Sequence, residues 1–239
     1  AVFLAATALA LLIPLSGLVL PLTRPRDLLR AGQEVLRTGT DTLLYAAGTA
    51  VVACFLGTIL AIGVGRRNRL RLLTLAGSLV AVSLPPSAAA LGFLAFGARS
   101  PASFDWLFRG QLTVMLCLGL RFLPVVTVVA LRAFGAVPPS YAGASAISGV
   151  SLARHLQRIL LPALRPTLLT AGVLVSLLGA ADVGTMLLLH PPGRPNLSLA
   201  IFTIMGNAPE SLVAALCLLY MTTAGVVLWL LAWRGRGRA

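Results

Sequence analysis

The sequence predicts an all-α, polytopic membrane protein with about six transmembrane helices. Hydrophobic residues make up 58% of the chain and charged residues only 10%, whereas a soluble domain carries roughly 25% charged residues. The mean hydropathy is +0.96, and several apolar stretches reach the roughly 20 residues that cross a bilayer. We therefore expect most side chains to face lipid or other helices rather than water.

Six stretches are apolar enough to span the membrane, and we interpret residues 1–239 as a single transmembrane domain. The expected spans cover residues 1–22, 42–65, 72–96, 112–134, 167–189 and 212–233. Pro85-Pro86 interrupts the third span, which is expected to kink or break there. Freed backbone groups at membrane depth are tolerated only where protein or a cavity covers them. A simply kinked span and a broken helix beside a pathway both fit this pattern.

The distribution of arginines predicts the orientation of the chain in the membrane. All 19 residues counted as lysine or arginine are arginines, and the formal net charge is +13. They lie in short runs between apolar stretches, as the positive-inside rule predicts, and not on one basic face as in nucleic-acid-binding proteins. With the C-terminus in the cytoplasm, the inner loops hold eleven arginines and the outer loops seven. We predict a multi-pass protein with both termini cytoplasmic and no nucleic-acid partner.

The loop at 135–166, between the fourth and fifth spans, predicts two short helices. Pro138-Pro139 should end the preceding span, and Ser140 can cap a new helix. Residues 141–148 are unusually small, so another backbone could approach them closely. Gly149 should end this helix in the left-handed conformation.

A second short helix should run from a cap at Ser151 to Pro162. Its apolar residues recur at helical spacing, which predicts an amphipathic helix on the inner membrane surface; they are Leu152, Leu156, Ile159 and Leu160. Pro162 and Pro166 should stop this helix and lead into the fifth span. Taken alone, the pattern also fits an ordinary interfacial loop.

The same loop resembles the EAA signature of permeases of binding-protein-dependent ABC importers. Gly143-Ala144-Ser145 stands where that signature has Glu-Ala-Ala, Gly149 matches its glycine, and Leu161-Pro162 matches its Leu-Pro ending. Gly143 departs from the family pattern, which puts one polar contact to the ATPase in doubt. The resemblance covers about residues 40–235 and implies the type I importer (MetI-like) permease fold.

The resemblance also implies partners and a role for the loop. Such permeases act as two halves or copies in the bacterial inner (plasma) membrane, receive substrate from an extracytoplasmic binding protein, and dock on a cytoplasmic ATPase dimer. The chain has no phosphate-binding GxxxxGK[ST] loop, so ATP hydrolysis is expected on another chain, and neither catalytic residues nor a cofactor is expected here. The implied ATPase-coupling residues are Pro139, Ala142, Gly143, Ala144, Ser145, Gly149, Leu161 and Pro162.

Further segments resemble the iron(III)-type branch of this family. They are Ser83-Leu84-Pro85-Pro86, Arg121-Phe122-Leu123-Pro124, Ala181-Asp182-Val183-Gly184 and His190-Pro191-Pro192-Gly193. The resemblance implies iron(III) as a cargo, with thiamine, phosphonate, polyamine or oxyanion importers as alternatives. The chain begins at Ala1 without methionine, which fits the second half of a fused permease or a separate subunit.

Two charged residues fall within expected spans. Arg121 lies near the middle of the fourth and Asp182 nearer the outer end of the fifth, and each costs about 2.5–3.5 kcal/mol at a span centre. We hypothesise that they pair, packing the two spans together or lining an outer gate; separate snorkelling toward water is the alternative. His155 and His190 have no carboxylate cluster at ligand spacing, so no metal site is predicted.

Two other functional classes are weighed against the importer. An intramembrane serine protease needs a base within reach of its nucleophile, and neither histidine lies inside a span. A secondary transporter favours helices broken at matching positions in two halves, and only the third span is clearly interrupted in the sequence. Cys54, Cys117 and Cys217 lie in apolar stretches without metal spacing and are expected to be small buried hydrophobes.

Overall fold

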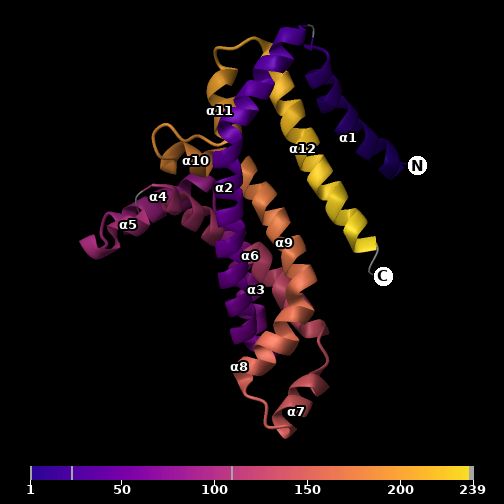
Figure 1. Cartoon of the computed structure of the whole chain (residues 1–239), viewed down its shortest axis with the longest axis vertical. Helices are drawn as coiled ribbons and strands as arrows, with labels where there is room; N and C mark the ends of the chain where they lie inside the picture. Colours follow the sequence, from indigo (N-terminus) through magenta and orange to yellow (C-terminus); the bar gives the residue numbers. More distant parts are fainter. Residues whose placement is uncertain (1, 23, 109, 237–239) are drawn as a thin grey trace. The chain divides into compact units, whose positions relative to one another are not determined.

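The computed structural model describes residues 2–22, 24–108 and 110–236, in which helices alternate with short connections and no strand occurs (Figure 1). Arg109 and Arg238, which entered the loop counts above, lie outside the described residues. The chain divides into two compact units. The first holds residues up to Thr42 and from Arg194 onward, and the second holds Leu43–Gly193.

The first unit contains both ends of the chain. Its helices are α1 (Val2–Val19), the first part of α2 (Pro25–Val64), α11 (Leu197–Met205) and α12 (Glu210–Arg236). Its core is a buried cluster in which small residues let helices approach closely: Ala31, Leu197, Ala215 and Leu216.

Buried polar groups join these elements. The hydroxyl of Ser211 in α12 donates to the carboxylate of Asp27 in α2, and both residues are buried. The hydroxyl oxygen of Thr42 accepts from the N–H of Leu197 at 2.8 Å, and Asn196 caps α11. Such pairing offsets the cost of removing polar groups from water.

The second unit holds the region that the sequence marked as functional. Its helices, after the rest of α2, are α3 (Asn68–Ser83), α4 (Pro86–Gly97), η1 (Ala102–Phe104), α5 (Asp105–Phe108), α6 (Gln111–Ala136), α7 (Pro139–Ile147), α8 (Leu152–His155), η2 (Leu156–Leu160), α9 (Leu161–Ala181) and α10 (Val183–Leu189). α6 packs against α9 and α3, and α4 packs against α10. Part of the core of this unit comes from α2, α6 and α9 together, through Ala53, Val126 and Val175.

Glycines allow these helices to pack closely. A Cβ added at Gly119 of α6 would lie 2.5 Å from Val52 of α2, and one at Gly179 of α9 would lie 3.1 Å from Thr49. Helices in membranes associate through such small residues, because lipid provides no hydrophobic drive between them.

Four described helices are long and apolar enough to cross a membrane, or five if a bent pair counts as one span. They are Pro25–Val64, Gln111–Ala136, Leu152–Ala181 and Glu210–Leu230, with Asn68–Ser83 and Pro86–Gly97 as the bent pair. The all-α polytopic fold is thus confirmed. The expected first span coincides with α1, which has 18 residues.

Two helices have other bounds than the spans expected within them. α2 begins at Pro25, before the expected start of the second span near residue 42, because the helix continues through a charged segment that hydropathy alone does not recognise as helix. α9 ends at Ala181, before the expected end of the fifth span near residue 189, because Asp182 leaves the helical conformation and starts α10.

The interruption expected at Pro85-Pro86 is confirmed. Leu84 and Pro85 are extended, with ψ of 129° and 148°, and Pro86 begins α4, where its missing N–H costs nothing. α3 and α4 consequently meet at 100°.

Candidate functional site

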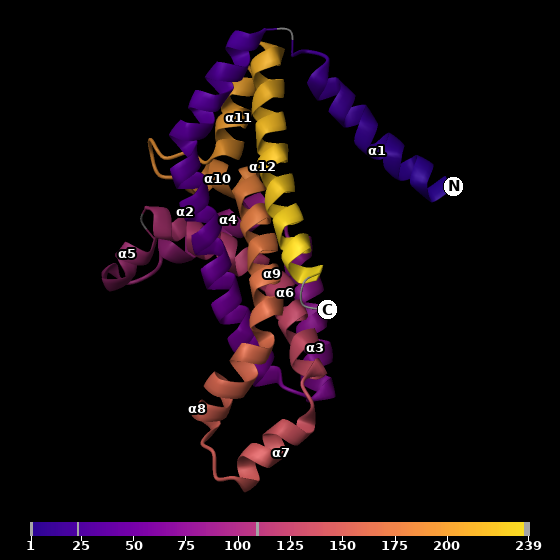
Figure 2. The same cartoon turned by 45° about the vertical axis from the view of Figure 1, so that its right-hand side comes forward.

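The predicted coupling loop forms two short arms between α6 and α9. Figure 2 shows α7 and α8 as these arms, at the end of the α6–α9 pair. Gly149 connects them with a φ of +67°, the left-handed conformation that glycine adopts without steric penalty. The left-handed turn expected at Gly149 is therefore present.

Neither arm begins with the side-chain cap that we expected. Pro138 is the N-cap of α7 and Pro139 opens the helix, so Ser140 lies inside it and the prediction of a cap at Ser140 is wrong. Proline suits this first position, because its fixed φ is already helical. Ser151 does occupy the N-cap of α8, but its side chain accepts no hydrogen bond there.

A hydrogen bond between side chains joins the two arms. Ser145 is the buried residue of α7, and its hydroxyl donates to the backbone carbonyl of Tyr141 at 2.8 Å. Its Oγ also lies 2.8 Å from Nδ1 of His155 in α8. Because the Ser145 proton is already donated, Oγ accepts from an Nδ1–H of His155. Ser145 therefore holds α7 against α8 and does not present its side chain to solvent.

Arg66 links the end of α2 to the base of the loop. Its guanidinium donates to the backbone carbonyl of Val137, directly after α6, and its Cζ lies 6.0 Å from the ring centroid of Phe134. A cavity of about 330 Å³ beside it is lined by Tyr141 and His155 among others. A cation at the last carbonyls of a helix is favourable, so Arg66 stabilises the point at which α6 gives way to α7.

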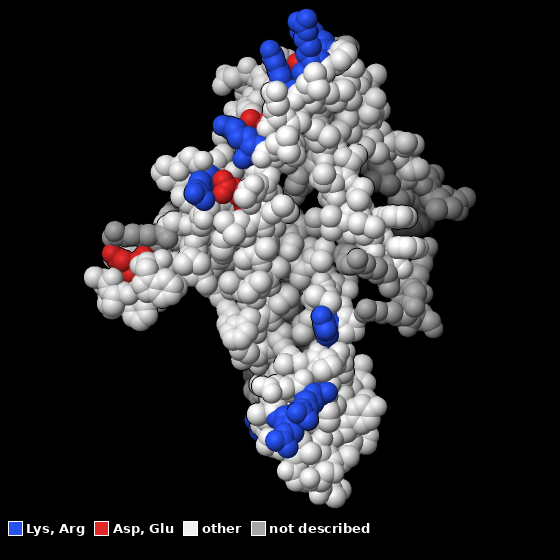
Figure 3. All heavy atoms as spheres, in the orientation of Figure 1, with Lys and Arg blue, Asp and Glu red and all other residues white. Residues whose placement is uncertain are grey.

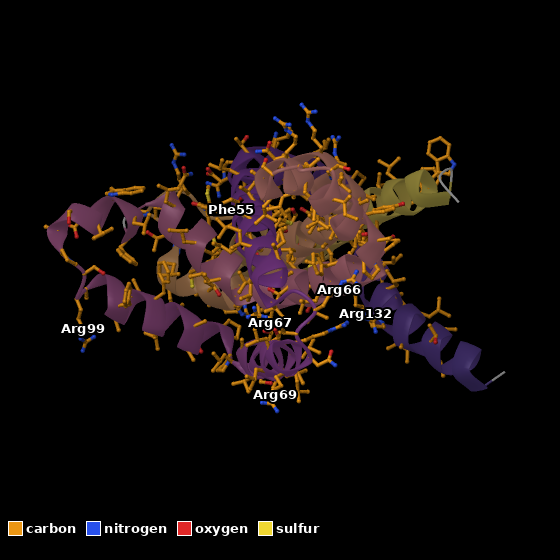
Figure 4. All side chains as sticks on the ribbon, turned by 90° about the horizontal axis from the view of Figure 1, so that it is seen from below. Phe55, Arg66, Arg67, Arg69, Arg99 and Arg132 are labelled. Carbon is orange, nitrogen blue, oxygen red and sulfur yellow. The ribbon has the colours of Figure 1, made fainter. Side chains whose placement is uncertain are left out.

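Arginines gather at this end of the second unit. Figure 4 shows Arg66, Arg67, Arg69 and Arg132 around the α2–α3 corner and the neighbouring part of α6, and all four are exposed. Figure 3 shows further basic side chains over α8 and the beginning of α9. This enrichment is typical of the cytoplasmic side of membrane proteins.

The outer surface of α7 is apolar and has no covering in the described residues. Ile147 is 91% exposed and Tyr141 is 50% exposed, although this loop lies at the arginine-rich end. A Cβ added at Gly143 would meet nothing within 4 Å. Exposed apolar side chains at the arginine-rich end of the unit make this helix a candidate interaction surface. Neither Ile147 nor Arg66 was predicted as a site residue from the sequence, although the apolar Ile147 stands out in a helix of otherwise mostly small residues.

The second arm does not end at Pro162 as expected. The helix instead runs continuously over Leu152–Ala181. One π-helical turn at Leu156–Leu160 precedes Pro162, and the N–H of Leu161 bonds to the carbonyl of Leu156. The wider turn accommodates the proline, whose missing N–H would break a regular α-helical ladder. Leu161 and Pro162 therefore lie within the helix that becomes the fifth span.

An ion pair lies deeper in the second unit. The guanidinium of Arg121 in α6 pairs with Oδ2 of Asp182, and the two side chains are 16% and 4% exposed. The other carboxylate oxygen of Asp182 accepts from the N–H of Thr185 at 2.7 Å and so caps α10. The guanidinium also lies 5.1 Å from the ring centroid of Phe122. One carboxylate thus neutralises a buried cation and satisfies a helix terminus.

The ion pair lies at a second interruption that the sequence did not reveal. α9 ends at Ala181, Asp182 is extended with a ψ of 104°, and α10 follows at once. α10 packs on α4, and a Cβ added at Gly184 would lie 2.6 Å from Cβ of Pro86. The short helices that follow the two breaks therefore contact each other closely.

Several solved structures resemble the chain, and two ABC transporters are among them. A bacterial ABC transporter involved in the import of the acidic polysaccharide alginate matches with a TM-score of 0.70 and 15% identity, over 98% of this chain and 92% of that one. The inward-facing methionine ABC transporter MetNI matches with a TM-score of 0.60 and 17% identity, over 87% and 97%. The chain has the fold of an ABC importer permease. No protein-family model and no curated protein matches its sequence.

The remaining histidine and the cysteines are not among the site residues that the sequence predicts. Nδ1 of His190 lies 2.9 Å from the carbonyl oxygen of Met186, one turn earlier. The three cysteines are free, with Cys117 buried and Cys54 and Cys217 partly buried. The described residues contain no group of three or more His, Cys, Asp or Glu side chains that could hold a metal ion.

Proposed function

We propose that the chain is the pore-forming permease of an ABC importer and that α7 docks it on a cytoplasmic ATPase. The observation that carries this proposal is the exposed apolar surface of α7, on a loop between two spanning helices in a permease fold. A helix that offers small residues and one protruding isoleucine suits a cleft in a partner protein.

The loop is built to transmit movement of this helix. Ser145 and His155 join α7 to α8, and α8 continues into α9 without a stop. Arg66 joins the start of the loop to α2. A displacement of α7 by the ATPase would therefore reach α2 and α9 through polar contacts and a continuous helix. The eight coupling residues named from the sequence remain part of this proposal, with Ile147 added.

The proposal includes the partners that the family resemblance implies. They are an ATPase dimer on the arginine-rich side, an extracytoplasmic binding protein on the other side, and a second permease half or copy. Both termini are assigned to the cytoplasm on the basis of the arginine count. ATP hydrolysis belongs to the partner, and this chain supplies the solute pathway.

The cargo is proposed as a small solute, with iron(III) as the candidate that the sequence motifs favour. One of the two solved transporters is involved in the import of an acidic polysaccharide and the other is a methionine transporter. Because these cargoes are so different, they do not indicate which solute this chain transports. Thiamine, phosphonate, polyamine and oxyanion cargoes remain alternatives. Selection can rest with the binding protein, so the ligand bound by that protein is the most direct evidence of the cargo.

A secondary transporter is a second candidate, because the two helix breaks lie together. Discontinuous helices that meet at membrane depth often form the binding site of such transporters, and here α4 contacts α10 directly after both breaks. The exposed loop helix α7 has no role in that mechanism, which favours the importer.

Liposome reconstitution separates the two functions. The importer predicts uptake that requires the ATPase, ATP and the binding protein, with ATP hydrolysis stimulated by loaded binding protein. Uptake driven by a proton gradient with the permease alone would reject the importer in favour of the secondary transporter. A variant with Ile147→Asp should lose ATP-driven uptake while retaining membrane insertion.

A further inference from the structure

An apolar groove of about 660 Å³ lies between α2 and α9 in the second unit. Figure 2 shows the two helices running beside each other. The groove exists because small residues face it, including Ala47 and Ala50 of α2 and Gly172 of α9. Leu161 and Pro162 of the proposed coupling residues line the groove, whereas α7 and the Arg121–Asp182 pair do not.

One guanidinium lies in this apolar groove. Arg165 lines it and is exposed, and no described residue forms an ion pair or hydrogen bond with its side chain. Gln157 is the other polar side chain available, because the hydroxyl of Ser176 donates to the carbonyl of Gly172 in its own helix. The groove is therefore polar toward the coupling loop and apolar beyond Arg165.

The depth of Arg165 in the membrane follows from the helix. Sixteen residues separate it from Ala181 at the end of α9, a distance of about 24 Å at 1.5 Å per residue. The hydrocarbon core is about 30 Å thick. Arg165 therefore lies near the headgroup level on the side of the coupling loop, and the groove beyond it lies at the depth of acyl chains.

We propose that the groove binds an anionic phospholipid, with its phosphate at Arg165 and an acyl chain between α2 and α9. Basic pockets between spanning helices attract anionic headgroups, and Arg154 and Arg158 are exposed nearby on the loop side. The apolar walls offer no ligands to a hydrophilic solute beyond Arg165. An apolar helix from a second copy would bury the guanidinium without a partner, which is costly. This inference does not depend on the proposed transport function.

The test uses the full chain, purified in neutral detergent and freed of lipid. Phosphatidylglycerol and phosphatidylcholine with the same acyl chains are added, and thermal unfolding is measured. We expect phosphatidylglycerol at 100-fold its Kd to raise the unfolding midpoint by on the order of 5 °C, and phosphatidylcholine to have little effect. Glycerol 3-phosphate, which has no acyl chain, should not stabilise the protein. An equal response to both lipids, or a full response to glycerol 3-phosphate, would overturn the proposal.

Two variants in the groove and one control variant outside it locate the effect. Arg165→Gln should abolish the phosphatidylglycerol shift, whereas Arg132→Gln, at an exposed arginine of α6 outside the groove, should retain it. Gly172→Leu should fill the groove and abolish the shift with Arg165 intact, since a Cβ there already lies 3.2 Å from Sγ of Cys54. A full shift in Arg165→Gln contradicts the proposal.

Cys54 provides an independent check on the occupant. In a variant with Cys117→Ala and Cys217→Ala, oxidative crosslinking through Cys54 should give no dimer, because a lipid chain occupies the groove. Efficient dimer formation would show that a second copy lies there instead and would reject the lipid.

Discussion

Arg121 of α6 forms an ion pair with Asp182, the residue that separates α9 from α10. Asp182→Asn keeps an oxygen to cap α10 but leaves the cation buried without a counter-charge. We expect a loss of about 3–5 kcal/mol in the free energy of unfolding, because an unpaired buried charge is far more costly than the pair is stabilising.

The double variant Arg121→Gln with Asp182→Asn is the matched control. It removes both charges and should recover most of the stability lost by Asp182→Asn alone. Denaturant unfolding in detergent measures both. If Asp182→Asn proves as stable as the wild type, the charge of Asp182 does not stabilise the buried guanidinium of Arg121.

The contact between the two helix breaks predicts a steric effect at Gly184. Gly184→Ala brings a methyl group against the rigid ring of Pro86, and overpacking of this kind costs about 1–3 kcal/mol. Gly92→Ala in α4, where an added Cβ meets nothing within 4 Å, should be neutral or slightly stabilising. Thermal unfolding of the two variants compares them, and equal midpoints would mean that α4 and α10 can separate freely.

The bond between Ser145 and His155 predicts the rigidity of the coupling loop. Ser145→Ala removes the hydroxyl that both Tyr141 and His155 contact, a loss of about 1 kcal/mol. Hydrogen exchange of the α7 amides should accelerate about fivefold. Ser145→Thr should restore protection, and Ser140→Ala, at an exposed position in the same helix, should leave it unchanged. Unaltered exchange in Ser145→Ala would show that the bond does not hold α7.

Hydropathy predicted the fourth span closely, because α6 is mostly apolar, with two arginines in 26 residues, and has clear ends at residues 111 and 136. It predicted a span from residue 42 and gave no sign of the first seventeen residues of α2, since Arg26, Asp27, Arg30 and Glu34 make that part of the helix polar. Pro25 followed by an acidic residue in the first turn is a helix-start signal. The charged residues of a segment indicate whether water or lipid surrounds it. They do not indicate whether the segment is helical.

The candidate site was predictable where backbone chemistry decides the structure. Gly149 turns the chain with positive φ, as glycine alone does readily. The break at Asp182 was missed because no proline marks it; an aspartate with Thr185 three residues later is the cap that the structure uses. Pro162 caused the opposite error, because it predicted the end of a helix. The helix in fact continues past Pro162 by way of a π-helical turn. Contacts between distant segments, such as Arg66 with Val137, leave no local pattern in the sequence.

The central claim, that α7 docks on an ATPase, is tested most directly at Gly143. Gly143 is exposed, and a side chain there meets no other part of the described structure, so a change in function reports on a partner. Gly77→Leu in α3, also exposed and without neighbours within 4 Å, is the control for adding the same side chain elsewhere.

The measurement is the affinity of the purified permease for its cognate ATPase subunit. Gly143→Leu should weaken binding by roughly tenfold or more, the equivalent of about 1.4 kcal/mol, while Gly77→Leu binds as the wild type does. Wild-type affinity and ATP-driven uptake in Gly143→Leu would contradict the account of α7 as the docking helix.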